Sequence, residues 1–178
     1  MKAAHPDRRV EVWFQDEARI GQQGTLTSVW AERGSRPVRV KQTEYQWVHL
    51  FAAVDPLTGR NSAMLAPHAD THYMDAHLRF IGEAAGVGTH VVLVPDRAGW
   101  HGSKALRVPA NVTLLFLPPY SPELNPVERV WRYLRGNYLS NRAFKDYDEI
   151  FQVAGDAWNR LSDATLASIT ATAWLRAG

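Results

Sequence analysis

The change in hydrophobic period near residue 70 constrains the fold of this chain more than any other feature of its sequence. The segments before it have the alternating or continuous apolar pattern of β-strands, and they are residues 10–17, 47–54 and 62–66. The segment 70–86 then places an apolar residue at every third or fourth position, which is typical of an amphipathic helix. Strands followed by a helix predict a sheet that begins with antiparallel pairs.

The second half of the chain mixes strands and helices. The apolar segments 90–96 and 112–118 are predicted strands, and 126–138 and 146–161 are predicted helices. These later strands must be reached through crossovers, which are right-handed in nearly all sheets. We therefore expect an α/β fold in which antiparallel strands come first, strands reached through helical crossovers follow, and helices flank the mixed sheet. Shorter elements are also predicted, namely strands near 29–30 and over 38–41 and a helical turn at 103–106.

The composition is that of a globular chain large enough for one folded domain. Of its 178 residues, 46% are hydrophobic and 21% are charged, which excludes a disordered chain. No apolar stretch approaches the roughly 20 residues of a membrane span, and the N-terminus has no apolar signal-peptide core. A net charge of +2 permits a nucleic-acid partner without requiring one. These features predict a cytoplasmic protein.

Three acidic residues stand at the ends of predicted elements. Asp16 lies late in the first strand, Asp96 ends the strand 90–96, and Glu128 lies in the first turn of the helix 126–138. Because ligands in α/β sheets gather beyond the carboxyl ends of strands, we expect Asp16 and Asp96 to meet there. The chain has no cysteine, so a metal must be held by carboxylates or imidazoles. A carboxylate cluster suits Mg²⁺, and two such ions activate an attacking water and stabilise the leaving oxygen.

Each of these acids also has a purely structural interpretation. An aspartate that follows a strand is most often a turn or capping residue. For Glu128 the alternative is a capping box, in which Asn125 is the N-cap, Pro126 the first helical residue and Glu128 the third. Spacing alone leaves both interpretations open for all three acids.

Three segments carry a resemblance to a known family, and they read FQDEARIG, VPDRAGWH and LPPYSPELNPVERVW. They resemble the catalytic segments of the DDE transposases of the mariner superfamily, in its bacterial insertion-sequence branch. The resemblance implies a ribonuclease H-like fold and cleavage and joining of DNA strands with two Mg²⁺ or Mn²⁺ ions. It also implies that Asp16, Asp96 and Glu128 are the three catalytic, metal-binding acids. The match extends from about residue 10 to residue 160.

Neighbours of the three acids bear on this assignment. Glu17 points to the opposite face of a regular strand from Asp16, so Asp16 is the preferred acid. Glu123 lies in the proline-rich loop and is interpreted as a loop residue. Arg97 departs from the family pattern, in which Asn or Gly commonly follows the second aspartate. A cation at this position either weakens metal binding or holds a phosphate.

Basic residues and one histidine are candidates for contact with DNA. His101 has the family's spacing from Asp96 and is expected to contact a phosphate or tune the metal site; the alternative is a histidine hydrogen-bonded within its loop. Two arginine-containing sets can neutralise phosphates, although each is equally well explained as a solvated face. The DNA-contact candidates are His101, Arg97, Arg33, Arg36, Arg39, Lys41, Arg129 and Arg132, with Arg135 continuing the last set. Trp100 and Trp131 are interpreted as core or loop anchors.

The sequence thus favours the catalytic domain of a transposase that acts on element ends and target DNA. Residues 1–178 are expected to form a single ribonuclease H-like catalytic domain without the helix-turn-helix domains that precede it in such transposases. Self-association in the active complex and association with the nucleoid are part of this expectation. Two alternatives stay open: a ribonuclease H-like nuclease with another nucleic-acid substrate, and a decayed or co-opted domain that binds DNA or protein without cutting.

Overall fold

The computed structural model describes residues 6–23, 31–35, 42, 44–97, 99, 101 and 105–173. Several predictions concern residues outside these ranges. They are the strands near 29–30 and over 38–41, the first two residues of the helical turn at 103–106, and the residues Arg36, Arg39, Lys41 and Trp100.

The centre of the molecule is a five-stranded mixed sheet with the strand order β3-β2-β1-β4-β5. The strands are β1 (Arg9–Gly21), β2 (Trp47–Val54), β3 (Asn61–Ala66), β4 (Thr89–Val94) and β5 (Val112–Leu114). Strands β1, β2 and β3 pair antiparallel, whereas β4 pairs parallel with β1 and β5 parallel with β4. The predicted order of antiparallel strands followed by parallel crossovers is confirmed.

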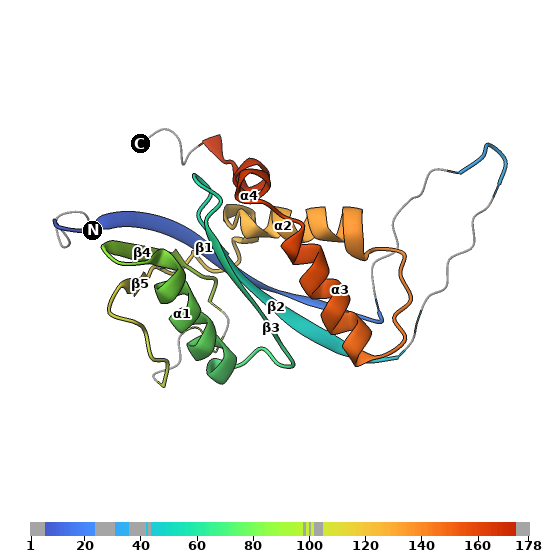
Figure 1. Cartoon of the computed structure of the whole chain (residues 1–178), viewed down its shortest axis with the longest axis horizontal. Helices are drawn as coiled ribbons and strands as arrows, with labels where there is room; N and C mark the ends of the chain where they lie inside the picture. Colours follow the sequence, from blue (N-terminus) through green and yellow to red (C-terminus); the bar gives the residue numbers. More distant parts are fainter. Residues whose placement is uncertain are drawn as a thin grey trace.

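Helices cover both faces of the sheet, as Figure 1 shows. The helices are α1 (Thr71–Ala85), α2 (Val127–Leu134), α3 (Tyr147–Asn159) and α4 (Asp163–Thr170), with a π-helical turn Arg135–Leu139 after α2. One core lies between the sheet and α1, and a second core lies between the sheet and the helices α2, α3 and α4. None of the described helices has the length and hydropathy of a membrane span.

Strand β1 contributes alternate residues to the two cores. Phe14, Ala18 and Ile20 pack on the side of α2 and α3, whereas Trp13 packs on the side of α1. This alternation follows from the two-residue period of a strand. The alternation also determines where the acidic side chains of β1 lie, because neighbours such as Asp16 and Glu17 must face opposite sides of the sheet.

The local signals in the sequence place most element ends correctly. Asp70 caps α1 by accepting a hydrogen bond from the Tyr73 amide, and Asp146 caps α3 in the same way from the Glu149 amide.

Two predictions need correction. The strand expected over 112–118 ends at Leu114, and the helix expected over 126–138 changes at residue 135 into the π-helical turn. Helix α4 was not predicted.

Candidate active site

One cavity of about 410 Å³ brings the three predicted acids together. Asp16, Asp96 and Glu128 line it, although they come from three different elements. Arg97, Asn125 and the proline-rich segment form the rest of its wall. The chain separation of the acids shows that only the tertiary fold creates this cavity.

The pairing of β1 with β4 places Asp16 opposite Asp96. The parallel register ends with Phe14 opposite Val94, and each aspartate follows two residues later on its own chain segment. Strand β4 ends at Val94, whereas β1 continues to Gly21, so Asp96 lies beyond the end of its strand and Asp16 lies inside β1. The two aspartates do line one cavity, but the expectation that both stand beyond the carboxyl ends of their strands is wrong for Asp16.

The proline-rich segment attaches the start of α2 to β1 through Asn125. The buried Asn125 amide group donates from Nδ2 to the Gln15 carbonyl over 3.0 Å, and its Oδ1 accepts from the Val127 amide over 3.2 Å. The Asn125 backbone N–H donates to the Pro122 carbonyl instead of to Glu128. The capping-box interpretation is therefore wrong: α2 begins at Val127 with Pro126 as its N-cap, and Glu128 does not bond to the Asn125 N–H, although Asn125 Oδ1 does accept from the first helical amide.

Asp16 is a buried carboxylate held by a tryptophan. Its side chain lies on the α2 side of β1, where Trp131 Nε1 donates to Asp16 Oδ2 over 2.8 Å. The pKa of Asp16 is raised to about 7, chiefly by burial and also by the charges of Glu128 and Glu17, while the Trp131 hydrogen bond acts in the opposite direction. No described basic side chain forms an ion pair with Asp16.

On the opposite face of β1, Glu17 connects with Asp96 through His101. His101 Nε2 lies 2.8 Å from Glu17 Oε1, and His101 Nδ1 lies 2.7 Å from Asp96 Oδ1. Gln15 Nε2 also donates to Glu17 Oε1 over 3.0 Å. Burial alone would lower the pKa of His101, but the hydrogen bonds with Asp96 and Glu17 outweigh it and raise the pKa to about 9.

This geometry bears on both roles expected of His101. The His101 side chain is fully buried and each ring nitrogen faces a carboxylate, so neither nitrogen is presented to a DNA phosphate at the surface. The Asp96 side chain is about half exposed, at 51%. The arrangement therefore supports a role of His101 in orienting Asp96.

The cavity has the donor chemistry of a Mg²⁺ or Mn²⁺ site. Its three acids are hard oxygen donors, and the buried Asp16 has a neighbouring carboxylate, Glu128, that disfavours its ionised form. Among the described residues no group of three or more His, Asp or Glu side chains is arranged so that all of them could hold one metal ion. Mg²⁺ does not need such a group, because it commonly takes one or two carboxylates and completes its shell with water and phosphate oxygens. The residues present therefore fit such an ion.

The predicted basic residues are distributed unevenly around this cavity. Arg97 is exposed at its wall and donates from Nε to the Leu117 carbonyl over 2.9 Å. Arg129 donates to the Ala171 carbonyl over 2.6 Å, at the end of α4. Arg132 and Arg33 are exposed and do not line the cavity. Among the described members of this set of arginines and lysines, only Arg97 lines the cavity of the acids.

Three contributors to the site were not predicted from sequence. Glu17 was set aside because of its strand face, Trp131 was interpreted only as a core anchor, and Asn125 only as a helix cap. Trp131 does belong to the core, at 2% exposure, but its indole N–H also orients Asp16. The available signal was helical spacing, since Trp131 follows Glu128 by three residues and so shares its side of α2.

Comparisons with known proteins agree with this geometry. A family model described as DDE superfamily endonuclease matches residues 11–151. An uncharacterized protein, y4pE/y4sA, from Sinorhizobium fredii (strain NBRC 101917 / NGR234) is 51% identical over 117 residues, which cover 66% of this chain and 87% of that protein.

Two solved structures of Mos1 share the fold. The Mos1 strand transfer complex has a TM-score of 0.66 at 16% identity, over 90% of this chain and 50% of the Mos1 chain. The mariner Mos1 paired end complex with Mg has a TM-score of 0.67 at 16% identity, over 90% of this chain and 51% of the Mos1 chain. The chain thus spans about half the length of these Mos1 chains. The predicted ribonuclease H-like arrangement of sheet and helices is confirmed.

Proposed function

The chain belongs to the DDE superfamily of endonucleases, and on that basis we propose that it is the catalytic domain of a DNA transposase. Its reaction is metal-dependent cleavage of DNA at an element end followed by strand transfer into target DNA. The observation that carries the proposal is that Asp16, Asp96 and Glu128, which come from three separate segments of the chain, line one cavity. An acid that only caps a helix or turn would not need two other acids in the same cavity.

The three acids are the residues that would hold the metal ions. Two Mg²⁺ or Mn²⁺ ions, when bound, supply Lewis-acid stabilisation of the charge that develops on phosphate and leaving oxygens. Asp16 is oriented by Trp131, and Asp96 is oriented by His101. Arg97, at the cavity wall, is placed to contact a phosphate oxygen of the bound strand.

The reaction we propose has two displacements at phosphorus. In the first, a water oxygen bonds to the phosphorus at the element end and the bond to the 3′ oxygen breaks. One water proton is passed to the departing 3′ oxygen, which leaves as a 3′-hydroxyl, and the other is lost to solvent when the new 5′-phosphate ionises. In the second, that 3′-hydroxyl attacks a target phosphodiester and displaces the target strand's own 3′ oxygen. The number of phosphodiester bonds is conserved in the second step, so joining needs no external energy source and no covalent protein–DNA intermediate.

DNA and a second copy of the chain are the partners of this activity. A Mos1 transposase of the same fold has been solved as a paired-end complex with a left transposon end. We extend to this chain the binding of element ends and target DNA, with self-association when two ends are paired.

The decisive experiment is a cleavage and joining assay with element ends and Mn²⁺. Wild type is compared with Asp96→Ala and Glu128→Gln, and Glu123→Gln serves as the control because Glu123 lies in the neighbouring turn outside the cavity. We expect both site variants to lose cleavage and the control to retain it. Undiminished cleavage by either site variant would reject the assignment of these acids.

Arg97 supports one alternative function. A guanidinium at the wall of the acid cavity competes with metal ions for the carboxylates, as expected of a domain that binds DNA without cutting it. Calorimetric titration with Mn²⁺ separates the two functions. An enzyme of the proposed kind binds Mn²⁺ and loses affinity in Asp16→Asn, whereas a non-catalytic domain shows no saturable binding in either form.

A further inference from the structure

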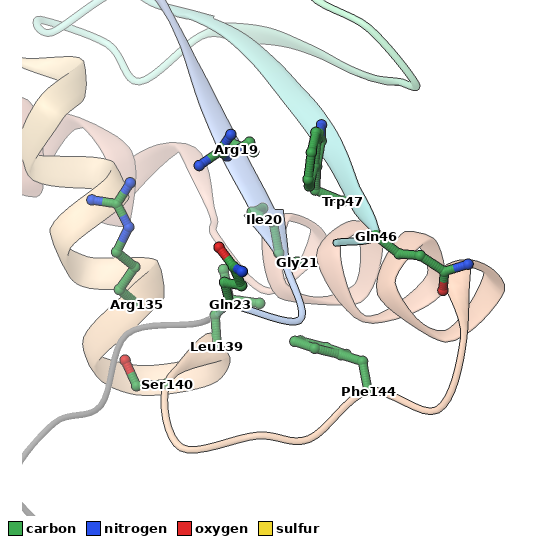
Figure 2. A pocket seen from close by; sticks show the side chains of 10 residues that line it. All are labelled: Arg19, Ile20, Gly21, Gln23, Gln46, Trp47, Arg135, Leu139, Ser140 and Phe144. Atoms are coloured by element: carbon green, nitrogen blue, oxygen red, sulfur yellow. The ribbon is translucent and has the colours of Figure 1, made fainter. Parts of the chain in front are cut away.

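A second cavity, of about 150 Å³, lies at the other end of β1 and α2. It is lined by the end of β1 with the start of β2 on one side and by the π-helical turn with residue 144 on the other. Figure 2 shows the guanidinium groups of Arg19 and Arg135 on the same side of this cavity, contributed by β1 and by the π-helical turn.

The lining of this cavity is positively charged and rich in hydrogen-bond donors. The described residues around it include two arginines and no carboxylate. Neither Arg19 nor Arg135 forms an ion pair with another described residue. The side-chain amide of Gln23 adds a neutral donor. A pair of guanidinium groups without an acidic partner is a site for an anion.

The Arg19 guanidinium is held in place without being neutralised. It lies over the Trp47 ring at 4.8 Å from the ring centroid, which restricts its position but adds no negative charge.

The cavity and the acid site lie on the same two segments of the chain. Trp131 on α2 donates to Asp16 on β1, and Arg135 and Ile20, further along each segment, both line the second cavity. Arg19 follows Asp16 by three residues, or about 10 Å of strand, so its side chain leaves from the opposite face of β1, in the part of the strand that no longer pairs with β4. Arg135 follows Glu128 by seven residues, or about 10 Å of helix.

We propose that the Arg19–Arg135 cavity is a second phosphate-binding site, which holds the backbone of the DNA strand near the phosphate bound at the acids. The inference rests on the proposed function, because it takes the same DNA strand as its ligand. Its contacts are with phosphate only, so the site positions the strand without reading its sequence.

The test is the salt dependence of DNA binding, measured by fluorescence anisotropy on a labelled mixed-sequence duplex without divalent metal. Each phosphate contact contributes about 0.9 to the slope of log affinity against log salt. We expect Arg19→Gln and Arg135→Gln each to lower the slope by about 0.9, and the double variant by about 1.8. At about 0.1 M salt, one lost contact of this size weakens binding about eightfold.

Two controls separate charge from packing. Arg19→Lys removes the planar guanidinium but keeps the charge, so we expect it to retain most of the slope. Arg79→Gln removes an exposed arginine on α1, outside both cavities, and we expect it to leave the slope unchanged. Thermal unfolding of each variant verifies that the fold is kept.

The outcomes separate this inference from the function on which it rests. An unchanged slope in the double variant would overturn the second phosphate site, while metal-dependent cleavage by the wild type would still support the transposase. A wild type with no salt-dependent DNA binding would overturn both.

Discussion

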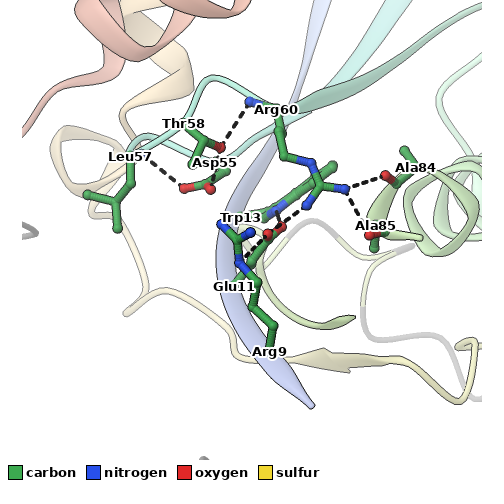
Figure 3. A network of polar contacts seen from close by, with 9 residues as sticks. All are labelled: Arg9, Glu11, Trp13, Asp55, Leu57, Thr58, Arg60, Ala84 and Ala85. Atoms are coloured by element: carbon green, nitrogen blue, oxygen red, sulfur yellow. Dashed lines mark hydrogen bonds and ion pairs between the residues drawn. The ribbon is translucent and has the colours of Figure 1, made fainter. Parts of the chain in front are cut away.

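Strand β1 carries two buried carboxylates, Glu11 and Asp16, whose surroundings differ. Each accepts a hydrogen bond from an indole N–H, from Trp13 over 3.0 Å and from Trp131 over 2.8 Å respectively. Glu11 also pairs with Arg60 Nη1 over 2.6 Å and with Arg9 Nε over 3.0 Å, as Figure 3 shows. Asp16 has no such partner among the described residues, and its charged neighbour is Glu128.

This difference distinguishes a structural acid from one suited to bind a cation. At Glu11 the protein supplies its own cations, and Arg60 also donates to the Ala84 and Ala85 carbonyls at the end of α1, each over 2.8 Å. The ion pair thus joins the sheet to the helix. At Asp16 the fold buries a carboxylate beside another acid, which destabilises the ionised form unless a cation enters.

The largest expected difference between the two acids is in catalysis. We expect Asp16→Asn to lower metal-dependent DNA cleavage by at least about 1000-fold, because metal-ion stabilisation is worth several kcal/mol and each 1.36 kcal/mol is tenfold in rate. Glu11→Gln should leave the cleavage rate unchanged. Initial rates with Mn²⁺ at saturating DNA measure both, and comparable losses in the two variants would remove the distinction.

The second difference is the pH dependence of stability in the metal-free protein. The pKa of Asp16 is about 7 in the folded state, whereas an ordinary aspartate has a pKa of 3.8. Between these two pH values the folded state therefore binds more protons than the unfolded state. Its contribution to stability is therefore lost as pH rises through this window. We expect Asp16→Asn to be more stable than wild type by up to about 4 kcal/mol at about pH 8, with the gain vanishing at or below about pH 4.

Urea denaturation at several pH values measures this effect. Mn²⁺ should stabilise the wild type and not the variant, since only the wild type has the carboxylate. A constant stability difference between the two proteins across the whole pH range would show that the Asp16 carboxyl is not the group responsible.

The third expected effect is a loss of stability on substitution of Glu11, whereas substitution of Asp16 is expected to increase stability. Glu11→Gln removes the negative charge that Arg60 and Arg9 contact, and a charged hydrogen bond of this kind contributes about 2 kcal/mol. We expect the free energy of unfolding to fall by about that amount, as measured by urea denaturation. Glu123→Gln, in the turn before α2, is the matched control and should change stability little.

The smallest effect expected is on metal affinity, through the residues that support Asp96. His101→Asn removes a ring that joins Glu17 to Asp96, and loss of such a supporting contact typically costs 10–100-fold in metal affinity. We expect about a tenfold weaker Mn²⁺ affinity by calorimetry, at the lower limit because Asp96 is half exposed. His72→Asn, an exposed change on α1, should have no effect. Equal Mn²⁺ affinity in wild type and His101→Asn would refute the supporting role.

Prediction from sequence succeeded where the physical cause is local. The apolar run 47–54 coincides with β2, and the predicted helices that start at residues 70 and 146 match α1 and α3, whose caps are Asp70 and Asp146. Each depends on residues a few positions apart, through strand or helix periodicity and side-chain capping. Helix α4 was missed because its apolar pattern is short and contains two threonines, although Ser162 caps it by accepting from the Thr165 amide.

Prediction failed where the cause joins distant residues. Glu17 was set aside correctly as facing away from Asp16, but its partner His101 lies 84 positions along the chain and cannot be inferred from a strand pattern. The cavity of Arg19 and Arg135 likewise depends on the packing of α2 along β1. No local period in the sequence encodes that packing.

By itself the sequence determined which residue types stand at the ends of strands and helices, and so it identified Asp16, Asp96 and Glu128 as candidates. The tertiary structure decided which acids are neutralised, because Glu11 meets Arg60 across 49 positions of the chain whereas Asp16 meets another acid. The physical reason is that periodicity acts over a few residues, while the charge state of a buried carboxylate depends on whatever the whole fold places beside it.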